Sequence, residues 1–356
     1  MEEKIERLIE WFEKGKAYPY TLEFNITSKC NLKCKMCWLR STKPNYEELD
    51  DSEILRIVKE ALKMGVEEFR FPGSGEPLMR KNILFQAMKI IKKEERKGVL
   101  ITNGTLFTEE DVRNVITMGW DVVTISLDGP NEKINDYIRG VKGAFQNAKR
   151  TLLLFKKWKK KLKKKNPWIR MNVVLTNKNF DKLDKMIILA KKMSVNEVLL
   201  QPLTIFSETG RKLQVSNIEK LNKSLEKALK FSKKFKIKTN METFIENLIV
   251  EKTNKMEEMI KEEIKKYRQK FLRIPCYEPF YNLIILPNGS IASCAVGNPL
   301  INIKNKSLEK VWFSKELMEA RRRLIKGILF PFCSHCCVPI FLENRRIRKI
   351  LSRLIK

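Results

Sequence analysis

The sequence predicts an α/β fold: a partial, TIM-like barrel of six strand–helix units, followed by a small C-terminal α+β module. Two observations lead to this expectation. Six short β-rich runs alternate with longer helical patterns, which indicates a parallel sheet with helical crossovers. After residue 205 the alternation stops, and a charged helical stretch precedes a hairpin pattern flanked by cysteines. Six units are fewer than the eight that close a full barrel, so we expect an open (β/α)6 barrel.

Each predicted strand of the barrel ends at a turn signal or a polar loop. In the first strand, Leu22, Phe24 and Ile26 share one face. The six strands are Thr21–Thr27, Val66–Phe71, Gly98–Thr102, Asp121–Leu127, Ile169–Thr176 and Glu197–Leu203. The helical patterns that separate them are Asp51–Met64, Arg80–Lys97, Thr108–Met118, Ala144–Lys164 and Phe180–Met193.

We divide the chain into five segments. They are an N-terminal helix (1–18), the partial barrel (19–205), a charged helical connector (206–271), the cysteine-containing module (272–343) and a basic amphipathic C-terminal helix (344–356). Within the connector, Ser216–Lys234 and Asn247–Phe271 have helical patterns. Within the module, Asn282–Leu286 and Ile291–Ala295 flank a Pro-Asn-Gly turn, which predicts a β-hairpin.

Composition gives few limits on function. The chain has 356 residues, 43% of them hydrophobic, and a formal net charge of +30. No stretch approaches the roughly 18 apolar residues of a membrane span, and the start has no signal-peptide core, so we expect a cytoplasmic protein. The charge fits either a nucleic acid or anionic membrane partner or a Lys- and Glu-rich surface. Because the basic residues are spread along the whole chain, we favour the second interpretation.

The eight cysteines fall into two groups. Three lie near the start and five near the end, and none lies between Cys37 and Cys276. Disulfides are unusual in a reducing compartment. Clustering of this kind therefore favours metal sites over scattered buried thiols.

The first group is Cys30, Cys34 and Cys37, at spacings x3 and x2. It directly follows the first predicted strand, at the edge of the sheet where barrel enzymes place their chemistry. Fe–S clusters are held by cysteine thiolates, usually four for a 4Fe–4S cluster. Three local ligands would leave one iron open to bind a substrate, whereas a structural zinc site needs four ligands.

This pattern resembles the radical S-adenosylmethionine (radical SAM) superfamily, whose signature is C-x3-C-x2-C after the first strand of a partial barrel. Gly73-Ser-Gly-Glu-Pro77 follows the second strand and is similar to the glycine-rich segment that holds the methionine amino group of SAM in that family. One departure is Met36, where many members have an aromatic residue. The resemblance implies SAM contacts from Gly73, Gly75, Glu76, Pro77, Thr102, Ser126 and Arg139.

The second group resembles the SPASM/twitch extension of many radical SAM enzymes. Its pattern is Cys276-x17-Cys294, followed much later by Cys333-x2-Cys336. The resemblance implies one auxiliary 4Fe–4S cluster on these four thiols. Cys337 could replace Cys336, His335 lies inside the motif, and zinc is an alternative occupant because two cysteine pairs also suit zinc.

The resemblance implies an enzyme that reductively cleaves SAM to a 5′-deoxyadenosyl radical and abstracts hydrogen from a substrate. It also implies a reducing partner similar to ferredoxin or flavodoxin. We expect a peptide, protein or small metabolite as the substrate of an oxidation or maturation reaction. Two alternatives remain open at this point: modification of RNA or lipid, suggested by the net charge, and a non-catalytic Fe–S protein.

Overall fold

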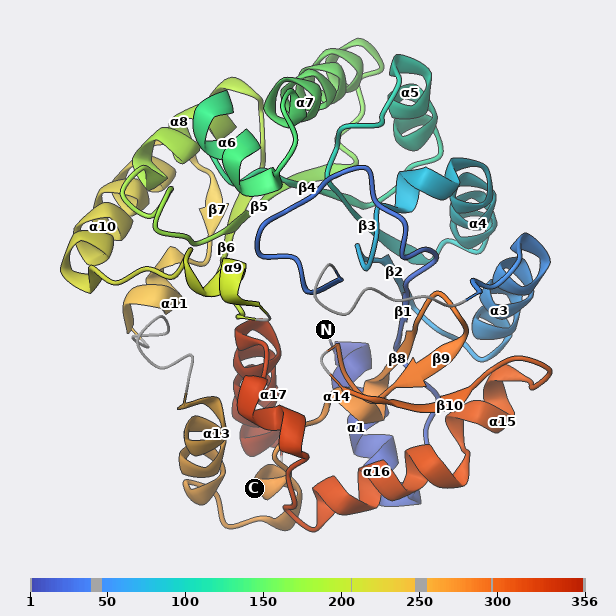
Figure 1. The fold of residues 1–356 in the computed structure, drawn as a ribbon. Coiled ribbons are helices and arrows are strands. Elements are labelled where there is room, and N and C mark those ends of the chain that lie inside the picture. The colour runs from blue at the N-terminus through green and yellow to red at the C-terminus, as the bar shows by residue number, and fades with distance from the viewer. Residues whose placement is uncertain (1, 40–46, 206, 247–254, 296, 355–356) are drawn as a thin grey trace.

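A single ten-stranded sheet organises the computed structural model, in the order β10-β9-β8-β1-β2-β3-β4-β5-β6-β7. The sheet curls into an open barrel, and helices pack around its outer side (Figure 1). Strands β1 to β6 run parallel, as their helical crossovers require. The predicted α/β partial barrel is therefore confirmed. The structure describes residues 2–39, 47–205, 207–246, 255–295 and 297–354.

The strands are short, and six of them correspond to the predicted barrel strands. They are β1 (Thr21–Phe24), β2 (Glu68–Phe71), β3 (Lys97–Thr102), β4 (Val122–Ser126), β5 (Trp168–Val174), β6 (Glu197–Gln201), β7 (Lys238–Thr239), β8 (Asn282–Ile285), β9 (Ser290–Ala292) and β10 (Pro299–Asn302).

The α-helices before the C-terminal module are α1 (Glu2–Lys14), α3 (Asp51–Lys63), α4 (Lys81–Lys93), α5 (Glu109–Thr117), α6 (Glu132–Arg139), α7 (Ala144–Lys161), α8 (Leu183–Lys192), α9 (Glu208–Arg211), α10 (Ile218–Phe235), α11 (Met241–Glu246) and α13 (Met256–Lys265). Those of the module are α14 (Glu278–Tyr281), α15 (Leu308–Trp312), α16 (Lys315–Ile325) and α17 (Val338–Leu354). The barrel helices α3, α4, α5, α7 and α8 bury apolar stripes against the sheet.

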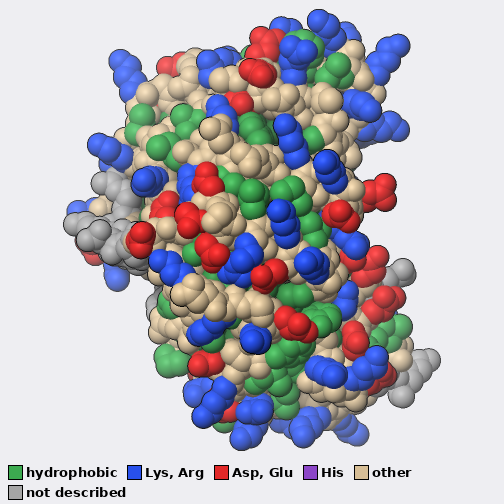
Figure 2. All heavy atoms as spheres, turned by 90° about the vertical axis from the view of Figure 1, so that its right-hand side faces the viewer, with side chains coloured by type: hydrophobic (Ala, Val, Ile, Leu, Met, Phe, Trp, Pro, Cys, Tyr) green, Lys and Arg blue, Asp and Glu red, His purple; other side chains and the backbone are tan. Residues whose placement is uncertain are grey.

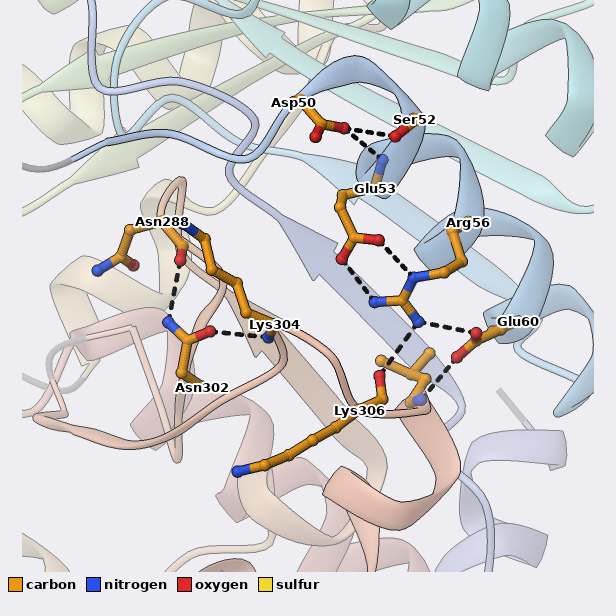
Figure 3. Close-up of polar contacts among 10 residues, drawn as sticks. Asp50, Ser52, Glu53, Arg56, Glu60, Asn288, Asn302, Lys304 and Lys306 are labelled. Carbon is orange, nitrogen blue, oxygen red and sulfur yellow. Dashed lines mark hydrogen bonds and ion pairs between the residues drawn. The ribbon is translucent and has the colours of Figure 1, made fainter.

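The C-terminal module extends the barrel sheet, which the sequence pattern did not indicate. Strand β8 pairs in parallel with β1 from Thr21↔Asn282 to Phe24↔Ile285, and β9 returns antiparallel through the predicted hairpin. The module also contacts α3 (Figure 3): Arg56 Nη1 donates to the Lys306 carbonyl at 3.1 Å, and the Leu308 amide donates to Glu60 at 2.6 Å. The barrel and the module therefore share a sheet and a polar interface.

Two predicted helices differ from the observed ones. The C-terminal helix begins at Val338, not Asn344, because Val338 and Phe341 are already buried in the main hydrophobic core. In the connector, residues 247–254 lie outside the described part, α13 covers Met256–Lys265, and a separate 3₁₀ turn follows. The division of the chain into five segments stays a prediction.

Helix α17 stands between the β6–α11 end of the sheet and the region of β8 and α14 (Figure 1). Its Arg348 is 1% exposed and donates to three backbone carbonyls, those of Leu272, Ile274 and Pro275, at 3.1, 2.8 and 2.7 Å. Buried carbonyl groups need such donors, because an unpaired one costs free energy. Arg348 thus fixes the segment that leads into Cys276.

We expect Arg348→Met to destabilise the protein by about 2–4 kcal/mol, because it leaves these three carbonyls unpaired in the interior. Thermal unfolding of the cluster-loaded protein measures the effect. Arg353→Met is the matched control, since Arg353 lies on the same helix but is exposed, and its unfolding midpoint should stay close to that of the wild type. Equal midpoints for the two variants would contradict the anchoring role.

On the face shown in Figure 2, the charged side chains are spread out rather than gathered in one patch. On the face shown in Figure 2, Lys and Arg side chains alternate with Asp and Glu over most of the visible surface. Many form ion pairs, such as Arg56 with Glu53 and Glu60, each at 2.8 Å. The chain has a formal net charge of +30. On this face its charged side chains form a mixed, solvated surface. None of the described helices has the length and hydropathy to cross a bilayer.

Candidate functional site

The first cysteine loop lies at the carboxyl end of β1 and is held against α6. The Lys33 amide donates to the Arg139 carbonyl at 3.1 Å, and the Lys35 amide donates to the Ile138 carbonyl at 2.9 Å. Gly140 ends α6 with φ +71°, and a Cβ there would lie 2.1 Å from the Lys33 carbonyl oxygen. Only glycine therefore lets the cysteine loop approach the end of this helix so closely.

The three thiols of this loop differ in exposure. Cys30 is exposed, while Cys34 and Cys37 are partly buried. Burial raises the pKa of the Cys34 thiol. Thiols in such surroundings become thiolates when a cation binds them, because metal binding displaces the proton. The donor set fits a three-thiolate cluster.

The glycine loop after β2 packs directly on the cysteine loop. The Gly75 amide donates to the Thr27 carbonyl at 2.9 Å, and the Glu76 amide donates to the Lys29 carbonyl at 2.8 Å. A Cβ at Gly75 would lie 2.3 Å from the Lys29 oxygen. The two predicted loops thus form one continuous edge at the mouth of the barrel.

Glu76 is 1% exposed, and its carboxylate already has partners within the chain. It accepts from Thr102 Oγ1 at 2.6 Å, from the Asn103 amide at 2.7 Å and from the Leu78 amide at 3.1 Å. Burial raises the pKa of this carboxyl. In this structure, Glu76 and Thr102 join the loops after β2 and β3, and their contacts with SAM stay a prediction.

Arg139 lies beside the cysteine loop and pairs with Asp128, a residue not predicted as part of the site. Its Nε is 2.8 Å from Asp128 Oδ2, and its Nη1 is 3.8 Å from Cys34 Sγ. Asp128 is fully buried and also accepts from the Val174 amide at 2.8 Å. Ser126, the last residue of β4, is partly exposed at the same edge. Asp128 lies two residues after the end of β4, and this position at the carboxyl end of a barrel strand was the sequence feature that could have identified it.

A second missed residue lies inside the barrel. Glu23 alternates with Leu22 and Phe24 along β1, so its side chain is on the inner face, where Arg70 of β2 is its register partner. Burial raises the pKa of Glu23 to about 7, although Arg70 opposes the shift. A carboxyl with a pKa near neutrality is a candidate for proton exchange with a bound substrate. Strand alternation alone would have identified it.

The second cysteine group surrounds one small cavity. The thiols that line it are Cys276, Cys294, Cys333 and Cys336, together with apolar side chains that include Ile260, Phe332 and Phe341. Asn344 of α17 donates to Cys276 Sγ at 3.6 Å. Hydrogen bonds to ligand sulfurs and an apolar shell are typical of Fe–S sites. The donor set fits a four-thiolate cluster.

Cys337, which directly precedes α17, does not line this cavity. Burial raises the pKa of its thiol to about 11, and the charges of Glu23 and Glu278 add to the shift. The side chain of His335 lies outside the described part. Among the described residues, no three Cys, His, Asp or Glu side chains converge as they would around one metal ion.

We expect Cys336→Ser to lose the auxiliary cluster and Cys337→Ser to keep it, because only Cys336 lines the cavity. Bound iron should fall from about eight to about four per chain in the first variant and stay near eight in the second, counted from four irons per cluster. Iron and acid-labile sulfide analysis after anaerobic reconstitution measures this. The reverse result would assign the ligand role to Cys337.

Two family models match the chain. The radical SAM superfamily model matches residues 24–189, and an iron–sulfur cluster-binding domain (SPASM) model matches residues 276–337. The chain belongs to the radical SAM superfamily. The radical SAM domain implies a 4Fe–4S cluster and SAM as cofactors, and the SPASM domain implies auxiliary Fe–S clusters.

The relatives of this chain have names that describe different functions. The mycofactocin maturase MftC of Mycolicibacterium smegmatis is 33% identical over 190 residues, which cover 53% of this chain and 46% of that protein. The chain thus spans about half the length of the first curated relatives it matches. A cofactor-modifying protein for tungsten-containing aldehyde ferredoxin oxidoreductase of Pyrococcus furiosus is 25% identical, covering 88% of this chain and 86% of that protein.

Solved structures share the fold. Streptococcus suis SuiB bound to its precursor peptide SuiA superposes with a TM-score of 0.66 at 16% identity, covering 89% of this chain and 70% of that one. The enzyme anSMEcpe with bound AdoMet and a peptide gives a TM-score of 0.60 at 16% identity, covering 94% and 97%. These similarities establish the arrangement of the radical SAM barrel and its C-terminal module.

Proposed function

We propose that this chain is a radical SAM enzyme that reductively cleaves SAM and uses the resulting radical to take hydrogen from a substrate. One observation carries the proposal: the three-thiol loop and the glycine loop are joined by backbone hydrogen bonds from Gly75 and Glu76 at the carboxyl edge of the sheet. Cluster and SAM, when bound, supply the 5′-deoxyadenosyl radical.

The chain's own residues would hold and orient these cofactors. In the proposal, Cys30, Cys34 and Cys37 supply the thiolates of the first cluster. The carbonyl groups of the Gly73–Pro77 loop accept hydrogen bonds from the SAM ammonium group, since glycines allow close backbone approach. Arg139 can pair with the SAM carboxylate through a nitrogen not used by Asp128.

The proposed auxiliary cluster sits on Cys276, Cys294, Cys333 and Cys336. Its site is tied to the barrel through β8, which pairs with β1. On the module side, Asn344 of α17 accepts from the Tyr277 amide at 2.6 Å and so fixes the residue next to Cys276. Such a site can accept an electron from the substrate or fix its position. Both roles suit an oxidation or maturation reaction.

We propose a peptide or protein substrate. The support comes from the mycofactocin maturase relative and from two structural neighbours that hold peptides. The Pyrococcus relative, which matches most of the chain, supports a small cofactor as the second candidate. The electron donor would be a ferredoxin- or flavodoxin-like protein.

The test uses anaerobically reconstituted full-length protein, dithionite and SAM, with products quantified by liquid chromatography and mass spectrometry. We expect 5′-deoxyadenosine and methionine in equal amounts, even without substrate, because uncoupled cleavage needs only the radical SAM site. Intact SAM in the presence of a fully reduced cluster would contradict the proposal.

A further inference from the structure

An exposed aromatic ring lies between two lysines beside the first cysteine loop. Tyr137, on α6, is 47% exposed. The Lys35 ammonium is 4.8 Å from the centre of its ring, and the Lys178 ammonium is 5.5 Å from it. Lys35 lies between Cys34 and Cys37 in the sequence, so this ring marks the outer surface of the candidate cluster site.

The basic surface continues toward α9. Asn177, next to Lys178, donates from Nδ2 to the Lys212 carbonyl at 2.8 Å, and Lys212 is exposed. The loop and α9 are neighbours, because a Cβ at Gly210 would lie 3.9 Å from the Cα of Met36. We call Lys35, Tyr137, Lys178 and Lys212 the Tyr137 patch. Around the cysteine loop, the patch brings together α6, the segment after β5 and the end of α9.

The acidic side chains of α6 and α9 have partners outside the patch. Asp136 accepts from the Gly143 and Phe145 amides at 2.7 and 2.8 Å, which turns its charge toward the start of α7. Glu132 accepts from Gln146 on α7. Glu208 pairs with Arg211 at 3.4 Å. Asp136 and Glu132 keep their charges, since their hydrogen-bond donors are neutral, but no carboxylate among the described residues pairs with Lys35, Lys178 or Lys212, so these three charges are available to a partner.

We propose that the Tyr137 patch is the docking surface for an acidic one-electron donor protein. This inference rests on the proposed function, since SAM cleavage consumes one electron that must enter from outside. The donor loses one electron, the bond between sulfur and the 5′-carbon breaks, and methionine and a 5′-deoxyadenosyl radical result. A donor bound at the patch would lie over the cysteine loop, because Lys35 belongs to that loop and Met36 contacts α9.

The chemistry of the patch matches such a partner. Lysines opposite carboxylates raise the association rate and orient the encounter, and their effect weakens with salt. A half-exposed tyrosine adds apolar contact area of the kind enriched at protein interfaces. A small reductant such as dithionite needs neither feature.

The test compares two reductants on the reconstituted full-length protein. Lys178→Glu combined with Lys212→Glu reverses two patch charges, and Lys160→Glu combined with Lys164→Glu makes the same charge change on the exposed end of α7 and its following turn. With a reduced acidic ferredoxin below saturation, we expect 5′-deoxyadenosine formation to fall roughly tenfold in the patch variant and less than about twofold in the control. The patch effect should shrink as salt rises.

With dithionite, both variants should match the wild type. Equal ferredoxin-driven rates for the patch and control variants would overturn the docking surface while leaving SAM cleavage intact. If the wild type yields no 5′-deoxyadenosine with either reductant, the proposed function fails instead. Binding of oxidised, fluorescently labelled ferredoxin then tests the patch independently: loss in the patch variant alone supports it, and equal binding by both variants contradicts it.

Discussion

Cys34→Ala is expected to reduce 5′-deoxyadenosine formation to background and to lower bound iron from about eight to about four per chain. The reason is geometric. The Cys34 thiol is partly buried between Arg139 and the loop backbone, and the two remaining thiols, Cys30 and Cys37, cannot hold a four-iron cluster alone. Anaerobic product analysis and iron analysis on the same sample measure both effects.

Cys337→Ala is the matched control for this experiment. It also removes a partly buried thiol, but one that lies outside both candidate cluster sites. We expect it to retain iron and to cleave SAM at the rate of the wild type. SAM cleavage by Cys34→Ala at a comparable rate would show that the first cysteine group is not the reaction centre.

Gly75→Ala should weaken SAM binding at least tenfold, about 1.4 kcal/mol. The added Cβ would lie 2.3 Å from the Lys29 carbonyl oxygen, which is backbone and cannot move without displacing the cysteine loop. The glycine loop and the cysteine loop must then separate. Titration of the reconstituted protein with SAM, followed by the spectrum of the reduced cluster, measures the affinity.

Gly210→Ala serves as the control for Gly75→Ala. It lies beside the same cysteine loop, but its added Cβ would meet only ordinary contacts, the nearest being Ser207 Oγ at 3.4 Å. Its SAM affinity should equal that of the wild type. If both alanine variants bind SAM normally, the close packing of the two loops does not shape the SAM site.

Local patterns predicted the barrel well because its strands and helices are built from near neighbours. Strand β5, at Trp168–Val174, and helix α5, capped by Thr108, follow directly from alternation and capping. Helix α6 was missed, although Asn131 caps its start and Gly140 ends it. That omission also hid the contact between α6 and the cysteine loop.

Long-range pairing could not be read from the chain. Strand β8 adds to β1 across about 260 residues, and no local pattern states which edge of a sheet a distant hairpin will join. The choice between Cys336 and Cys337 likewise depends on the tertiary structure, because only the folded chain shows that Cys336 lines the cavity. The spacing of the cysteines alone is compatible with either thiol as the cluster ligand.

The central claim is that Cys30, Cys34 and Cys37 hold a cluster that binds SAM through an open iron. Electron paramagnetic resonance of the reduced protein, with and without SAM, tests it most directly when the wild type is compared with a variant carrying alanine at all three positions. We predict that SAM changes the spectrum of the wild type, and that the variant keeps about four irons whose spectrum does not respond to SAM. A wild-type spectrum unaffected by SAM, or a response that survives in the variant, would contradict the claim.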